Sequence, residues 1–169
     1  MRYVELTSDQ HREIRHHLFT DTDEQVAFAF ADWHADADNS TLRVTAVDFI
    51  APSAFAFQST YHIELLHETH ARLIKTAFDR GASLVEFHSH RSARAAQFSP
   101  SDIDGFAEFV PHVRWRLENR PYAAIVWHEG SFDGLVWETS EAAQLDGIRI
   151  ADTILKPTRR TVKRFWGKP

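Results

Sequence analysis

The chain has 169 residues, a net charge of −5, 43% apolar residues and 25% charged residues. This length and composition predict a single globular domain that buries about two-thirds of the surface of the unfolded chain. The sequence contains no cysteine, which excludes disulfides, thiolate metal sites and a cysteine nucleophile.

The N-terminal residues lack an apolar signal core, and no stretch approaches the roughly 18 apolar residues of a membrane span. We therefore expect a cytoplasmic protein that makes no membrane contact.

The first third of the chain predicts one short helix and a hairpin of two buried strands. Ile14 and Leu18 have helical spacing, and Ser8 or Asp9 is a suitable cap for a helix over residues 9–19. Alternating large and small apolar residues predict a buried strand over residues 24–31. A polar turn at 35–40 joins this strand to a partner at 42–50, and residues 54–57 predict a further short strand.

The rest of the chain predicts two longer helices, a central strand and a second hairpin. An apolar stripe predicts a helix over residues 61–80, ended by Gly81. A strand over residues 83–87 then leads into His88, and a helix follows at 100–109. Residues 123–128 and 132–138 predict the hairpin. We therefore expect an α/β fold with a mixed β-sheet flanked by helices.

The segment from His88 to Asp102 contains the residues that indicate chemistry. His88 and His90 follow a strand, in which residues two apart point to the same side, so their imidazoles should converge. Ser99, Pro100 and Asp102 form a helix-start pattern of hydroxyl cap, proline and first-turn acid. Two imidazoles and one carboxylate leave a fourth position open, as in catalytic zinc sites.

Each half of this pattern also has an ordinary structural interpretation. A His-x-His sequence arises by chance in a chain with 11 histidines, and Ser-Pro-x-Asp is a common helix cap. The two halves in this order, between a buried strand and a helix, favour a metal site. His67 and His70 are one residue too close for the His-Glu-x-x-His motif, so we expect them to be packed or solvated.

The His-x-His and Ser-x-x-Asp elements resemble the zinc-binding signature of the JAB/MPN (JAMM) metallopeptidases. The resemblance implies a JAB/MPN-like fold, similar to the cytidine-deaminase sandwich, with zinc bound by His88, His90 and Asp102. It also implies that Glu24, which opens the first buried strand, is the general base, and that Ser99 stabilises the oxyanion. Glu86 is the competing candidate for the base.

The same resemblance implies a peptidase or isopeptidase acting at the C-terminus of a ubiquitin-like protein. Small bacterial single-domain members of the family resemble peptidases that process or remove ubiquitin-like proteins, some of them beside E1- and E2-like enzymes in antiviral systems. Residues 50–60 either offer a strand edge to the substrate tail or form a connection that faces the core. A zinc hydrolase of small amides is a further alternative.

The basic residues are concentrated at the end of the chain. Residues 156–169 contain six of the 19 basic residues and no acid, so residues 1–155 carry 13 basic and 24 acidic side chains, a net charge of −11. We expect a JAB/MPN-like domain over 1–150 and a basic C-terminal tail over 151–169. A solvated tail is the simplest interpretation, and nucleic-acid binding is not expected. In the alternative function, the protein is a non-catalytic module that binds a partner through this tail, a hypothesis that Phe165 and Trp166 favour.

Overall fold

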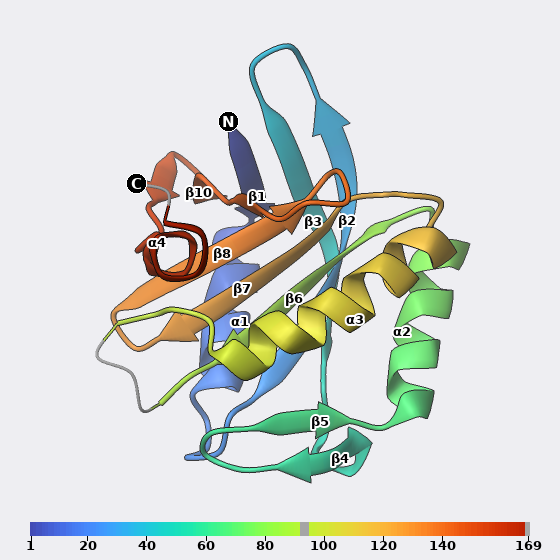
Figure 1. Cartoon of the computed structure of the whole chain (residues 1–169), viewed down its shortest axis with the longest axis vertical. Coiled ribbons are helices and arrows are strands. Elements are labelled where there is room, and N and C mark those ends of the chain that lie inside the picture. The colour runs from blue at the N-terminus through green and yellow to red at the C-terminus, as the bar shows by residue number, and fades with distance from the viewer. Residues whose placement is uncertain (92–94, 168–169) are drawn as a thin grey trace.

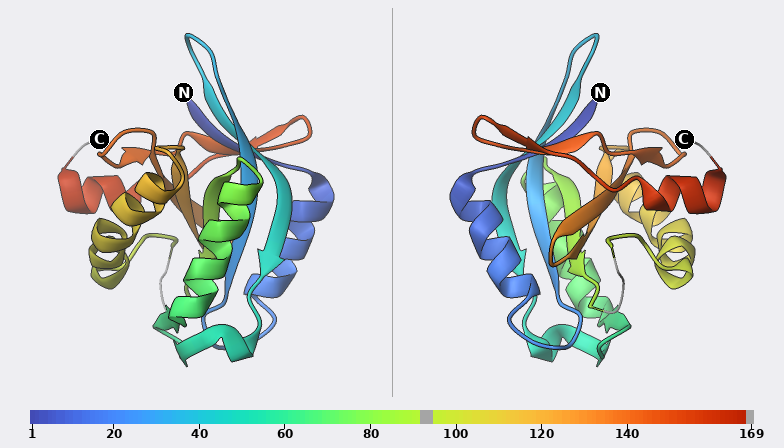
Figure 2. Two further views of the ribbon diagram at one scale, coloured as in Figure 1. Left: turned by 90° about the vertical axis from the view of Figure 1, so that its right-hand side faces the viewer. Right: turned by 90° about the vertical axis from the view of Figure 1, so that its left-hand side faces the viewer.

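The computed structural model describes residues 1–91 and 95–167 of the chain. These residues form a curled nine-stranded mixed sheet in the order β11-β10-β1-β3-β2-β6-β7-β8-β9 (Figure 1). Helix α1 (Ser8–Leu18) covers one face of the sheet, whereas α2 (His67–Asp79) and α3 (Pro100–Arg116) cover the other (Figure 2). The predicted mixed sheet with flanking helices is therefore confirmed.

Parallel pairing links β1 to both β3 and β10, and links β6 to β7, while the other neighbours are antiparallel. The strands of this sheet are β1 (Arg2–Leu6), β2 (Val26–Ala35), β3 (Ser40–Phe49), β6 (Ser83–Ser89), β7 (Tyr122–His128), β8 (Ser131–Trp137), β9 (Ala143–Gln144), β10 (Gly147–Ile150) and β11 (Thr153–Leu155). A 3-10 turn at Pro52–Ala54 leads into a separate two-stranded sheet, formed by β4 (Phe55–Gln58) and β5 (Ile63–Leu65).

The two faces of β6 enter different apolar clusters. Val85 and Phe87 pack into the cluster that contains the α1 side chains, and Leu84 packs into the cluster that contains α2 and α3. Because side chains alternate along a strand, Glu86 and His88 lie on the same face as Leu84. The core pattern therefore directs these two polar side chains toward α2 and α3.

The helix expected over residues 61–80 is wrong in its first part. Residues Ile63–Leu65 form β5, which pairs with β4, and the helix begins only at His67, after Leu66. Ile63 and Leu65 pack against the core by strand alternation, which the helical spacing of Ile63 and Leu66 concealed. The helix does end as expected, because Gly81 adopts a positive φ of 66°.

Other helices and strands predicted from the sequence are present in the structure, although some begin or end at different residues. The hairpins β2–β3 and β7–β8, the short strand β4 and the central strand β6 are all present. Helix α1 is capped by Thr7 and not by Ser8 or Asp9, since Thr7 and Gln10 form a reciprocal capping box. Helix α3 continues beyond the expected residue 109 to Arg116 and includes Pro111.

The C-terminal residues add two elements to the fold. Strand β11 pairs with β10 at the edge of the sheet, and α4 (Arg160–Trp166) packs its Val162 against the α2–α3 side of the core. Residues 151–167 of the expected basic tail are thus described, whereas Lys168 lies outside the described residues. In the described part of the chain, no helix has the length and apolar character needed to cross a membrane.

Candidate metal centre

Two histidines at the end of β6 form the first half of the candidate site. His88 occupies the last but one position of β6 and His90 follows the strand, with ring centroids 5.0 Å apart. Between them, Ser89 points the other way, and its hydroxyl accepts a hydrogen bond of 3.0 Å from the backbone of Gln25. Both histidines are buried, with 2% and 7% of their surface exposed, so neither imidazole is a solvated surface group.

Each imidazole is oriented by a hydrogen bond from its Nδ1 atom. His88 Nδ1 lies 3.0 Å from Oε1 of Glu86, and His90 Nδ1 lies 3.0 Å from the carbonyl oxygen of Gln97. Since both partners are acceptors, the Nδ1 atoms donate and the Nε2 atoms are left as lone-pair donors for a metal. Glu86 is itself held by the Tyr122 hydroxyl, which donates to Oε2 at 2.6 Å.

The carboxylate of the candidate site comes from the first turn of α3. Ser99 caps this helix, accepting from the Asp102 backbone, while the Ser99 backbone and hydroxyl donate to Asp102 Oδ2 at 2.7 and 2.8 Å. This capping box fixes the orientation of the carboxylate as well as that of the helix. The helix start predicted from Ser99, Pro100 and Asp102 is therefore confirmed.

The ligand atoms of His88, His90 and Asp102 all lie within 4.8 Å of one another. Asp102 Oδ2 is 3.2 Å from His90 Nε2 and 3.7 Å from His88 Nε2. Among the described residues, His88 Nε2 is a buried nitrogen without a hydrogen-bond partner, an arrangement that burial normally penalises. A metal ion would satisfy this atom, so the three residues fit a divalent cation.

Glu24 lies beside this group because of the register between β2 and β6. Val26 pairs with His88 in antiparallel register, and Gln25 lies opposite Ser89 just beyond, so Glu24 faces His90. Its carboxylate oxygen is 3.7 Å from His90 Nε2, and its residue is only 4% exposed. The β4–β5 hairpin also holds it, since the Glu24 backbone donates to Ser59 at 2.8 Å.

The charged side chains of the candidate site shift one another's pKa values. Although burial favours neutral His88, the carboxylates of Asp102 and Glu86 raise its pKa to about 10. Burial alone would raise the pKa of Asp102, but His88 and His90 hold it well below its usual range. Burial raises the pKa of Glu24, and the nearby histidines only partly offset the effect. Without a cation, the cluster thus retains a proton between its nitrogens and carboxylates.

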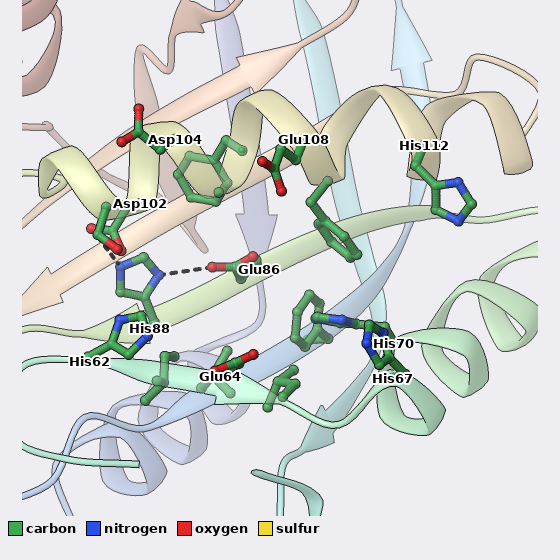
Figure 3. Close-up of a pocket in the computed structure, with 18 of the residues that line it drawn as sticks. His62, Glu64, His67, His70, Glu86, His88, Asp102, Asp104, Glu108 and His112 are labelled. Carbon is green, nitrogen blue, oxygen red and sulfur yellow. Dashed lines mark hydrogen bonds and ion pairs between the residues drawn. The ribbon is translucent and has the colours of Figure 1, made fainter. Parts of the chain in front are cut away.

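The candidate site opens into a groove of about 820 Å³ between β5, α2 and α3 (Figure 3). Val26, Phe28 and Phe106 contribute apolar surface to the groove, while Asp104 and Glu108 line it from α3. Among residues 1–91 and 95–167, its lining includes no lysine or arginine. The groove therefore presents an apolar surface with negative charge at its rim.

His67 and His70, which also line the groove, do not join the candidate site. His70 packs against Phe109, with ring centroids 4.5 Å apart, and burial lowers its pKa. His67 and His70 lie on α2, away from His88 and Asp102 (Figure 3). Their packed or solvated state is the one expected from the sequence.

Ser99 and Glu86, two residues with predicted roles, make contacts that the sequence did not reveal. Ser99 donates its hydroxyl proton to Asp102, so in this arrangement it positions a ligand, and its oxyanion role stays a prediction. Glu86, the competing base, has both oxygens engaged by His88 and Tyr122. The roles of Tyr122 and Gln97 had no sequence signal, because a lone tyrosine and a backbone carbonyl carry none.

Comparison with known proteins adds no family assignment. No protein-family model matches the chain, and no curated protein matches it.

Proposed function

We propose that the protein is a zinc-dependent peptidase or isopeptidase that hydrolyses the bond at the C-terminus of a ubiquitin-like protein. The observation that carries this proposal is the convergence of His88, His90 and Asp102 within 4.8 Å, with the buried Glu24 carboxylate 3.7 Å from a ligand nitrogen. Three ligands with a neighbouring acid are the arrangement of hydrolytic zinc sites, where a structural site would supply four protein ligands.

The resemblance to the JAB/MPN (JAMM) family supports the same proposal. The residues that carry it lie close together: Glu24, the His88 and His90 pair, and the helix start from Ser99 to Asp102. A sheet with helices on both faces is compatible with a JAB/MPN-like sandwich, which we propose as the fold type. A cytoplasmic location belongs to this proposal as well.

Each residue would have a distinct task in the reaction. His88, His90 and Asp102 would hold zinc, which when bound lowers the pKa of a water toward about 7 and polarises the scissile carbonyl. Glu24 takes a proton from the attacking water and delivers it to the leaving amine, a task suited to an acid whose pKa burial has raised. Ser99 is proposed to assist the developing oxyanion by turning its hydroxyl from Asp102.

The substrate tail is proposed to add as a strand to the free edge of β4, within residues 50–60. In the described residues β4 pairs with β5 alone, so its second edge offers backbone groups to an extended peptide. A ubiquitin-like protein carries such an extended C-terminal tail. Its conjugating E1- and E2-like enzymes, in a bacterial pathway such as antiviral defence, are the proposed partners.

Elemental analysis of the purified protein tests zinc binding independently of any enzymatic activity. We expect near-stoichiometric zinc in the native protein, its loss in His88→Ala, and its retention in His34→Ala, which removes an exposed histidine remote from the candidate site. Absence of metal from native protein supplied with zinc would refute the peptidase proposal. It would leave the non-catalytic interaction module as the better hypothesis.

Cleavage of a ubiquitin-like fusion protein then tests the chemistry. Glu24→Gln should retain zinc and lose about 100-fold or more in rate, whereas Glu13→Gln, an exposed acid on α1, should match the native enzyme. Equal activity of Glu24→Gln and native protein would contradict the assigned base. Cleavage of amino-acid conjugates without cleavage of the fusion would instead identify a hydrolase of small amides.

A further inference from the structure

The C-terminal helix, which is remote in sequence from the candidate metal ligands, carries a second concave surface. A cavity of about 720 Å³ lies beside α4. Of the six described residues that line it, four are cationic and none is acidic: Gln97, Thr158, Arg159, Arg160, Lys163 and Arg164. We refer to this surface as the basic groove.

Most of the positive charge in the basic groove is available to a ligand. Arg159 pairs with Asp146 at 3.0 Å. In residues 1–91 and 95–167, no carboxylate lies within ion-pair distance of Arg160, Lys163 or Arg164, and all three are exposed. The groove thus concentrates three unneutralised charges on a single short helix.

A buried aspartate anchors the start of α4 to the body of the protein. Asp133 on β8 is fully buried, and its carboxylate accepts hydrogen bonds of 3.2 Å from the Arg159 backbone and 2.9 Å from the Thr161 backbone. Val162 packs against the core beside them. The basic groove is therefore preorganised, and an incoming partner need not order it.

The groove is also joined to the loop that leads into the candidate metal centre. Thr158 donates its hydroxyl to the Ala96 carbonyl at 2.7 Å, and the Phe98 backbone donates to the Thr161 hydroxyl at 3.0 Å. Between them lies Gln97, which lines the groove and whose carbonyl accepts from His90 Nδ1. A partner in the groove would consequently lie next to the segment that orients a metal ligand.

From this charge and position, we infer that the basic groove binds an acidic polypeptide segment of a partner protein. The size of the surface favours a short peptide over nucleic acid. Helix α4 has seven residues, which span about 10 Å, and the rest of the chain, residues 1–155, carries a net charge of −11. A nucleic acid longer than a few nucleotides would extend from the groove over this acidic body.

Trp166, two residues beyond Arg164 at the end of α4, does not line the groove but leaves 43% of its surface exposed. An acidic segment with an adjacent apolar side chain would use both features. The inference does not depend on zinc or on peptidase activity, because the groove and its charges lie outside the metal-binding group.

Fluorescence anisotropy with a labelled oligoglutamate peptide tests this interface on the full chain. A triple charge reversal, Arg160→Glu with Lys163→Glu and Arg164→Glu, should weaken peptide binding by about tenfold or more, since each exposed ion pair contributes modestly and the three are removed together. Binding by the native chain should also weaken as salt rises. Circular dichroism of each variant establishes that it is folded.

A matched variant separates local recognition from net charge. Reversing Arg12 on α1, Lys75 on α2 and Arg116 on α3 changes the total charge by the same amount at exposed positions away from the groove. This control should bind the peptide within about twofold of the native chain. Equal weakening in both variants would overturn the inference.

Two further results would also overturn the proposed partner. Absence of peptide binding to the native chain at physiological salt would show that the groove does not recruit acidic segments. Tighter binding of a single-stranded oligonucleotide than of the peptide, lost in the Arg160, Lys163 and Arg164 variant, would assign the surface to nucleic acid.

Discussion

Replacement of Glu86 by glutamine tests whether His88 binds zinc through Nε2. Glu86 lies outside the group of candidate metal ligands, with Oε1 at 3.0 Å from His88 Nδ1 and Oε2 at 2.6 Å from the Tyr122 hydroxyl. Glutamine keeps the shape of the side chain and one oxygen acceptor for His88, but it removes the negative charge. The imidazole should remain oriented and become a weaker electron donor.

The expected loss follows from what each substitution removes. Outer-shell partners of metal-bound histidines contribute about 10- to 100-fold to metal affinity. Glu86→Gln should lie near the lower limit, about tenfold or about 1.4 kcal/mol. Glu86→Ala should approach about 100-fold. It should also destabilise the fold by about 1–3 kcal/mol, because the buried Tyr122 hydroxyl loses its acceptor.

Competition between the metal-free protein and a chromophoric zinc chelator measures these affinities. Glu64→Gln is the matched control, since Glu64 lines the same groove from β5 and is exposed; its zinc affinity should equal that of the native chain. Native affinity in Glu86→Gln, together with loss of zinc in His88→Ala, would refute the reasoning. Zinc binding by His88 would then not depend on the negative charge of the Glu86 carboxylate.

Three further predictions concern protons, the C-terminal segment and close backbone contacts. At neutral pH, zinc binding should release about one proton, because the carboxylates raise the pKa of His88 to about 10. The affinity for zinc should therefore rise with pH below that value. Calorimetry in buffers of different ionisation enthalpy measures the release, and detection of no released proton would contradict this prediction. Thr161→Val should cost about 1–3 kcal/mol in denaturant unfolding by orphaning the Phe98 N–H, whereas Thr161→Ser should restore most of the loss. Gly147→Ala should destabilise by about 1–3 kcal/mol, since its Cβ would lie 2.8 Å from a β11 carbonyl oxygen. Gly105→Ala, with no atom within 4 Å of the added Cβ, should instead stabilise α3 by about 1 kcal/mol; the same sign in both glycine variants would contradict the packing argument.

The residues of the candidate metal centre were predictable because local rules position them. Alternation along β6 places His88 and His90 on one side, and the capping box places Asp102 in the first turn of α3. Both rules act over a few residues and need no knowledge of the fold. The outer contacts of Glu86 with Tyr122 were not predictable, since they depend on the parallel pairing of β6 with β7.

Errors in the predicted fold occur where distant segments determine local structure. Strand β1 was not predicted, and it is paired with β10, which lies more than 140 positions later in the chain. Strand β5 has only three residues and exists through its pairing with β4. The anchoring of Thr161 by Asp133 likewise joins residues 28 positions apart. A charged residue that the fold buries is not distinguished in sequence from an exposed one.

Glu24 shows how a long-range position can still be encoded by a local pattern. Along β2, Val26, Phe28 and Phe30 enter the cluster beneath α2 and α3, while Ala29 and Ala31 enter the cluster beneath α1. A slip of one residue would exchange phenylalanine for alanine on both faces of the sheet, with overpacking on one side and cavities on the other. The alternation of large and small side chains therefore fixes the pairing of β2 with β6. The Glu24 carboxylate lies next to His90 because of this register between the two strands.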